Sequence, residues 1–178
     1  MRLLRGKGME RIMNRRRFFD ALTGLFAATA LPAAGKGAAE AAPLAKSRAE
    51  WRALLPGNRY AILFEEDTEA PFSSPLNHEK RKGTFVCAAC FLPVFDSAHK
   101  YDSGTGWPSF WDALPGAVRT KKDFKIILPR TEYHCARCGG HHGHVFDDGP
   151  KPTGLRYCNN GLALQFVPAG ESLPRLRT

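Results

Sequence analysis

Short segments rich in β-branched and aromatic residues make up most of the chain after residue 56, and Gly, Pro or Asp separates them. Such segments, bounded by turn residues, are typical of strands. The predicted strands are Tyr60–Phe64, Thr84–Val86, Pro93–Phe95, Phe124–Leu128, Glu132–His134, His144–Phe146 and Leu162–Val167. No long helical period interrupts them, and residues 101–122 are expected to be loop-like. We therefore predict a mainly antiparallel β domain.

A short helix is predicted immediately before these strands. Ser47 and Glu50 have the spacing of a capping box, and apolar residues follow from Trp51. A Pro-Gly pair at 56–57 ends the run, so one helix is expected over about residues 48–55. The domain then spans residues 47–168, and residues 169–178 form a C-terminal tail.

Residues 1–42 are interpreted as an export signal and linker. Three arginines at 15–17 precede an alanine-rich run over 21–34, and small residues follow. This order defines an export signal, and the paired arginines indicate the twin-arginine route to the periplasm. The run is shorter than the roughly 20 residues needed to cross a bilayer, although an uncleaved signal could still anchor the protein. The alternative is a basic amphipathic or disordered tail.

The formal charge of +9 belongs largely to this segment. Residues 1–42 hold eight Lys or Arg and three Asp or Glu, so the remainder carries +4. A zinc ion with four thiolates would lower that charge to about +2, which is ordinary for a soluble domain. The sequence pI of 9.6 is therefore weak support for nucleic-acid binding.

Five cysteines form the most specific chemical pattern of the chain. Four make two pairs with Cys-x-x-Cys spacing, Cys87 with Cys90 and Cys135 with Cys138. Four thiolates complete the tetrahedral shell of a structural zinc ion, which then has no open position for catalysis. In an exported protein the same cysteines could instead form two disulfides. The spacing favours the metal, and it leaves Cys158 as the sulfur free to react.

The neighbours of Cys158 are polar, as a reactive thiol requires. A free thiol has a pKa of about 8.5 and needs a cation, a hydrogen-bond donor or a base to act as a nucleophile at neutral pH. If residues 156–160 are extended, Arg156, Cys158 and Asn160 share one face. The alternative is a cysteine that fills the core as a small apolar side chain.

A histidine cluster over residues 141–144 supplies groups that titrate near neutral pH. His141 and His144 would face opposite sides of a regular strand, but Gly143 permits a turn or bulge that directs both inward. The cluster could instead bind a metal or lie in a solvated loop. The segment 104–111, rich in glycine and aromatic residues, suits either a core loop or the wall of an apolar pocket.

Seven blocks run in one order across about residues 48–168. They are Thr68–Phe72, Cys87–Cys90, Lys100–Phe110, Arg130–Glu132, Cys135–Cys138, Gly143–Pro150 and Pro152–Asn160. In these blocks the chain resembles the B-type methionine sulfoxide reductases, which reduce the R epimer of methionine sulfoxide. Each block alone is suggestive, and together they are highly specific.

The resemblance implies two antiparallel β-sheets stapled at one end by zinc, to which the sequence pattern adds one or two short N-terminal helices. It also implies the site residues: Cys158 as nucleophile, His141, His144 and Asn160 as groups that activate water and the sulfoxide oxygen, and Trp107 and Phe146 as substrate-binding residues. A thiolate attacks the sulfoxide sulfur while an acid protonates the oxygen. The products are methionine and a Cys158 sulfenic acid. Oxidised proteins or peptides are the expected substrates.

Three positions depart from the family pattern. Thr105 stands where many members carry a resolving cysteine, His142 where an aliphatic residue is usual, and Gly161 where serine is common. Because zinc takes the other four sulfurs, the Cys158 sulfenic acid has no partner in its own chain. We expect regeneration by an external thiol, either a thioredoxin-like protein or glutathione. We also expect a monomer that does not bind nucleic acid.

Two other classes of protein compete with this interpretation. A zinc-ribbon-like module that binds nucleic acid or protein would explain the two cysteine pairs and the high pI, but not a requirement for Cys158. A zinc hydrolase needs an open metal position, which four thiolates deny.

Overall fold

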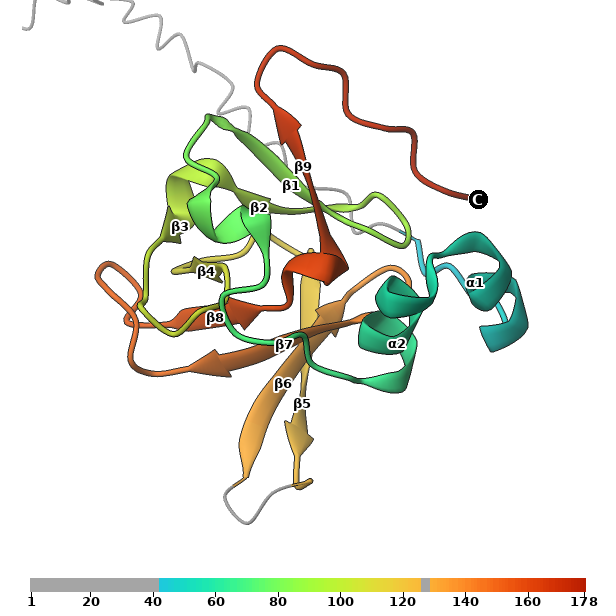
Figure 1. The fold of residues 1–178 in the computed structure, drawn as a ribbon, viewed down its shortest axis with the longest axis horizontal. Helices are drawn as coiled ribbons and strands as arrows, with labels where there is room; N and C mark the ends of the chain where they lie inside the picture. The colour runs from blue at the N-terminus through green and yellow to red at the C-terminus, as the bar shows by residue number, and fades with distance from the viewer. Residues whose placement is uncertain (1–41, 126–128) are drawn as a thin grey trace, which may run out of the picture. The chain divides into compact units, whose positions relative to one another are not determined.

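The computed structural model describes residues 42–125 and 129–178 (Figure 1). The predicted export signal therefore lies outside the described residues, apart from residue 42 at its end. Within the described ranges, every helix is too short or too polar to qualify as a membrane-spanning segment.

Two short helices precede the sheets, α1 (Arg48–Leu54) and α2 (Gly57–Glu65). The predicted capping box is confirmed, because Ser47 Oγ accepts from the amide of Glu50 at 3.2 Å and the Glu50 carboxylate accepts from the amide of Ser47 at 2.7 Å. Three further single turns are 3-10 helices: η1 (Pro75–His78), η2 (Ser97–His99) and η3 (Gly161–Ala163).

The predicted strand at Tyr60–Phe64 is wrong, because this segment forms most of α2. Five apolar residues are too few for periodicity to separate a helix from a strand, so tertiary packing decides. Tyr60 and Leu63 are buried, and the Phe64 ring stacks on Trp51 of α1 at 5.0 Å between centroids. These contacts are available only when α2 is helical and lies against α1.

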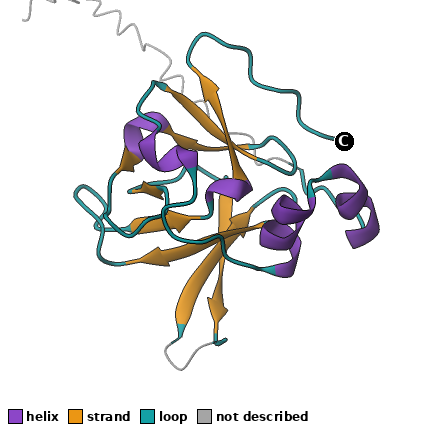
Figure 2. Cartoon of the chain, viewed as in Figure 1, coloured by secondary structure: helices purple, strands orange, loops and turns teal. Residues whose placement is uncertain are grey.

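Two antiparallel sheets form the body of the domain, as the resemblance implies (Figures 1 and 2). The smaller has the order β2-β1-β9, with bounds Pro93–Asp96, Gly83–Cys87 and Leu164–Pro168. The larger has the order β3-β4-β8-β7-β6-β5, with bounds Lys100–Tyr101, Ser109–Phe110, Arg156–Asn159, His141–Phe146, Arg130–Cys135 and Val118–Asp123.

The strand predicted at Phe124–Leu128 is absent at residues 124 and 125, and residues 126–128 lie outside the described residues. β5 ends at Asp123, and the Phe124 side chain is 72% exposed. Residues 101–122, expected to be loop-like, contain β4 and most of β5. The reason is that four consecutive residues of β5, from Arg119 to Lys122, are exposed, so this strand shows no apolar alternation.

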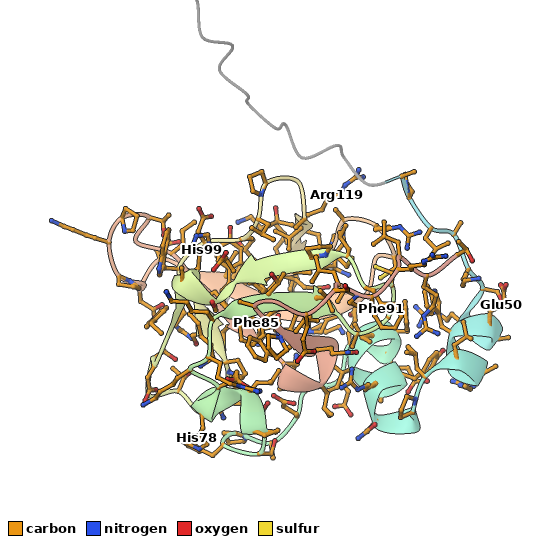
Figure 3. All side chains as sticks on the ribbon, turned by 90° about the horizontal axis from the view of Figure 1, so that it is seen from above. Glu50, His78, Phe85, Phe91, His99 and Arg119 are labelled. Atoms are coloured by element: carbon orange, nitrogen blue, oxygen red, sulfur yellow. The ribbon has the colours of Figure 1, made fainter. Side chains whose placement is uncertain are left out.

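Aromatic side chains from both sheets fill the space between them. Phe95 of β2 stacks on Phe110 of β4 at 4.1 Å between centroids, and Phe85 of β1 meets the same ring edge-on at 4.9 Å. Figure 3 shows Phe85 in the interior and Glu50 at the periphery on α1. Full burial of such a ring stabilises the fold by roughly 1.5–3 kcal/mol. This core fixes the sheets that carry the site.

Candidate active site and metal centre

The two Cys-x-x-Cys turns have the same backbone hydrogen bonds. In the first, Cys87 N donates to Leu92 O at 2.8 Å and Phe91 N donates to Cys87 O at 2.9 Å. In the second, Cys135 N donates to Gly140 O at 2.9 Å and Gly139 N donates to Cys135 O at 3.0 Å. One turn follows β1 of the small sheet and the other follows β6 of the large sheet. A shared ion would therefore join the two sheets.

The four sulfur atoms are arranged as a tetrahedral metal site requires. All lie within 4.8 Å of one another, with 3.7 Å between the Sγ atoms of Cys87 and Cys138 and 3.5 Å between those of Cys90 and Cys135. Zn–S bonds of about 2.3 Å at tetrahedral angles place sulfurs about 3.8 Å apart. All five cysteines are free thiols, so the disulfide alternative is not favoured. The donor set fits a closed structural zinc site.

Cys158 lies outside this cluster and at the centre of the large sheet. It pairs with His144 on one side and with Ser109 on the other, in the registers β7–β8 and β4–β8. Directly paired residues of antiparallel strands place their side chains on the same face of the sheet. Of the segment 156–160, considered above as extended, residues 156–159 form β8 and Asn160 follows it.

A cavity of about 140 Å³ opens at this thiol. Its lining residues are Thr68, Trp107, Arg130, Gly143, His144, Phe146, Cys158, Asn159 and Asn160. Small-molecule and cofactor sites usually measure about 300–1,000 Å³, whereas a cavity of about 150 Å³ holds one benzene. The cavity therefore suits the end of a side chain rather than a nucleotide or flavin.

Burial and two neighbours, Arg156 and Thr105, act on the charge state of the thiol. Burial raises the pKa of Cys158 above its ordinary value, while the positive charge of Arg156 and a hydrogen bond with Thr105 act against that rise. Arg156 is itself fixed by two hydrogen bonds of 2.8 Å to the Asp148 carboxylate, and its guanidinium lies over the Phe146 ring at 4.4 Å. Arg156 is thus held close enough to favour the thiolate.

The two predicted histidines come together through a bulge. Tyr133 pairs with Gly143 but His134 pairs with His141, so the ladder between β6 and β7 skips one residue. The rings of His141 and His144 are 5.6 Å apart, which confirms that both lie on one side. Gly143 is required because a Cβ there would lie 2.0 Å from the carbonyl oxygen of Cys158. Of the two, His144 lines the cavity and His141 does not; His141 Nδ1 lies 3.0 Å from the Glu132 carboxylate.

Glu69 holds two of the predicted site residues in place. The indole N–H of Trp107 donates to the backbone carbonyl of Glu69 at 3.1 Å, and the backbone amide of Glu69 donates to Asn160 Oδ1 at 3.1 Å. Its carboxylate accepts from the amides of Gly161 and Leu162. Asn160 also donates to the carbonyl of His142 at 3.1 Å. The Asn160 side chain therefore fixes the cavity wall. Asn160 itself comes directly after β8, which ends at Asn159.

Sequence reasoning missed Asp123, which contacts the site from β5. The Asp123 Oδ2 atom lies 2.8 Å from His144 Nε2 and accepts from Arg130 at 2.6 Å. Asp123 pairs with Arg130 across β5 and β6. The sequence signal was an acidic residue seven positions before Arg130, but only the strand register brings it to His144.

The three departures from the family pattern have different surroundings. The Thr105 hydroxyl lies 2.8 Å from Ser103 Oγ and hydrogen-bonds with Cys158. His142 is fully buried away from the cavity. At Gly161 a Cβ would lie 1.9 Å from Ser74 Oγ, so the Ser74 side chain occupies the space that a residue 161 side chain would need.

The fold and the site together define a β domain with a four-cysteine metal centre and a separate thiol at a small cavity. Residues 55–168 match the SelR domain family. A peptide methionine sulfoxide reductase MsrB of Agrobacterium fabrum is 51% identical over 124 residues, which cover 69% of this chain and 92% of that protein. The protein of the same name from Methanosarcina barkeri is 48% identical over 122 residues, 68% of this chain and 86% of that protein. The chain belongs to this family, the B-type methionine sulfoxide reductases.

Proposed function

We propose that the chain reduces methionine (R)-sulfoxide in proteins and peptides, with Cys158 as the nucleophile. The observation that carries this proposal is the separation of sulfurs: four form the metal cluster, and Cys158 lies at a cavity with Trp107 and His144. The small cavity fits a methionine side chain, and the indole provides an apolar surface for its methyl group. The names of the relatives support the reaction.

The reaction balances without an organic cofactor. Cys158 Sγ attacks the sulfoxide sulfur, and the thiol proton passes to the sulfoxide oxygen through a neighbouring acid–base group. We assign this role to His144 because it pairs with Cys158 across β7 and β8. The oxygen ends on Cys158, so one thiol and one sulfoxide become one sulfenic acid and one methionine. Arg156 stabilises the attacking thiolate by its charge.

Regeneration is assigned to an external thiol, either of a thioredoxin-like protein or of glutathione. Two such thiols reduce the sulfenic acid to a thiol and release water and one disulfide. Thr105 and the four clustered cysteines leave Cys158 without a resolving partner. Mass spectrometry of enzyme treated with sulfoxide and no reductant should show an oxygen adduct at Cys158. An internal disulfide formed with zinc retained would contradict this assignment.

The metal is proposed to be one structural Zn²⁺ per chain. Cys87, Cys90, Cys135 and Cys138 would hold it, and the bound ion would supply folding free energy rather than chemistry. We also propose export by the twin-arginine route on the basis of residues 14–34. Fusion of residues 1–46 to a reporter, with and without the paired arginines, would test the export step separately.

The deciding experiment compares wild type with Cys158→Ser. With dithiothreitol as reductant, wild type should reduce the R epimer of N-blocked methionine sulfoxide and not the S epimer. Cys158→Ser should lose turnover while zinc content and thermal unfolding stay unchanged. Equal turnover of both epimers, or activity that survives the substitution, would contradict the proposal; a zinc-ribbon-like binding module would be indifferent to Cys158.

A further inference from the structure

Asp123 holds one nitrogen of the His144 ring. His144 Nε2 lies 2.8 Å from Asp123 Oδ2, and Asp123 is only 6% exposed. The same carboxylate accepts from the amide of Lys125 at 2.8 Å and from Arg130 at 2.6 Å. Asp123 therefore reaches across β6 to a residue of β7, and three donors satisfy it.

The protons in this contact can be assigned. The amide of Lys125, then His144 and Arg130, hold the pKa of Asp123 well below its usual range, so the carboxylate can only accept. Burial lowers the pKa of His144, and Arg130 and His141 lower it further, although Asp123 acts in the opposite direction. A neutral imidazole carries one N–H, and a hydrogen bond to a carboxylate requires that it be on Nε2. Nδ1 is then left with a free lone pair.

We propose that Asp123 is a positioning residue that fixes His144 as the Nε2–H tautomer and makes Nδ1 the proton acceptor of the site. This inference rests on the proposed function for its catalytic consequence. His144 and Cys158 are direct partners across β7 and β8 and line the same cavity. Nδ1 takes the thiol proton as Sγ attacks the sulfoxide sulfur, and it returns that proton to the sulfoxide oxygen. His144 begins and ends neutral.

The charged Asp123 stabilises the imidazolium that exists between these two transfers. The other titratable or charged groups around His144 are Arg130 and Glu132 on β6, His141 on β7 and Cys158 on β8. Asp123 differs from these groups because its carboxylate hydrogen-bonds to a ring nitrogen of His144. Arg130 opposes the protonation of His144, so removal of the aspartate charge leaves this opposition unbalanced.

The direct test is the tautomer of His144 in the zinc-loaded full chain. Long-range ¹H–¹⁵N spectra distinguish the two neutral forms, and His144→Gln assigns the resonances. We expect the Nε2–H form in wild type and loss of this preference in Asp123→Asn. An Nδ1–H form in wild type would overturn the proposal whether or not the protein reduces methionine sulfoxide, so the two failures are distinguishable.

The kinetic test uses the same variants with methionine (R)-sulfoxide. In serine proteases, Asp-to-Asn substitution of the aspartate that hydrogen-bonds the catalytic histidine lowers turnover about 10⁴-fold. We expect turnover to fall by about 10²-fold or more in Asp123→Asn. The zinc content should stay the same, whereas alkylation of Cys158 at neutral pH should slow, because it also requires removal of the thiol proton. Asp123→Glu should recover part of the turnover. Glu66→Gln is the control, because Glu66 pairs with Lys121 and Lys125 in the same region but not with His144. Wild-type turnover in Asp123→Asn would overturn the proposal. Thermal unfolding verifies that the variant is folded.

Discussion

The burial of His142 should make the free energy of unfolding fall at acidic pH, and the substitution His142→Leu should remove this part of the pH dependence. Its side chain is fully buried, and among the described residues neither ring nitrogen has a hydrogen-bond partner. Burial lowers the pKa of His142 to about 4, and the neighbouring His141 contributes in the same direction, while Cys90 and Asn159 act against the shift. Leucine is of similar size and has no polar atoms to desolvate. The backbone carbonyl of residue 142, which accepts from Asn160, is retained in His142→Leu.

The sign and size of the effect follow from proton linkage. The folded pKa of about 4 lies below the unfolded value of 6.5, so the unfolded chain binds the proton first. Stability is therefore complete above pH 6.5 and is lost as the pH falls toward 4. Between pH 7 and pH 5 this one group costs wild type about 2 kcal/mol in the free energy of unfolding. At pH 7 the variant should already be more stable, by about 1–3 kcal/mol, because a buried unpaired polar group is removed.

Urea unfolding at pH 7 and pH 5, with zinc in excess, measures both quantities. The pH dependence of zinc release is common to both proteins, so the difference between wild type and His142→Leu isolates residue 142. His78→Asn is the matched control, because it removes an exposed histidine and should follow wild type. Parallel loss of stability in wild type and His142→Leu would refute the reasoning, as would a less stable variant at pH 7.

Three further substitutions test other contacts. Tyr133→Phe removes the buried hydroxyl that donates to Asn159 Oδ1 at 2.8 Å and should lower the free energy of unfolding by about 1–3 kcal/mol; unchanged urea unfolding would contradict this. Thr105→Val should raise the pKa of Cys158 further, seen as a shift of the alkylation-rate profile to higher pH, whereas Thr105→Ser should keep the wild-type profile. Gly161→Ser should destabilise by about 1–3 kcal/mol because its Cβ would meet Ser74, and Ser74→Gly should relieve most of that cost in the double variant; additive effects would disprove the contact.

Local spacing was enough to predict the two Cys-x-x-Cys turns, the start of α1 and the bulge at Gly143. A Cys-x-x-Cys turn brings its two sulfurs together by backbone geometry alone, and a capping box closes within four residues. Each Cys-x-x-Cys turn and the capping box depend on a few neighbouring residues, so the sequence contains all that they need. The prediction that Gly143 permits His141 and His144 to share a side was confirmed for the same reason. The meeting of the two turns, which follow β1 and β6, depends on the fold.

Contacts between distant segments decided what the sequence alone left open. The apolar segment Tyr60–Phe64 suits a helix or a strand, and its packing on Trp51 selects the helix. The exposed edge strand β5 has no apolar alternation, and it is defined only by its pairing with β6. Asp123 meets His144, and Ser74 takes the place of a side chain at residue 161, because sheet register and loop packing join residues far apart in sequence. The chain itself determined which chemical groups are present, whereas the fold determined which of them touch, because hydrogen bonds and excluded volume act only at contact distance.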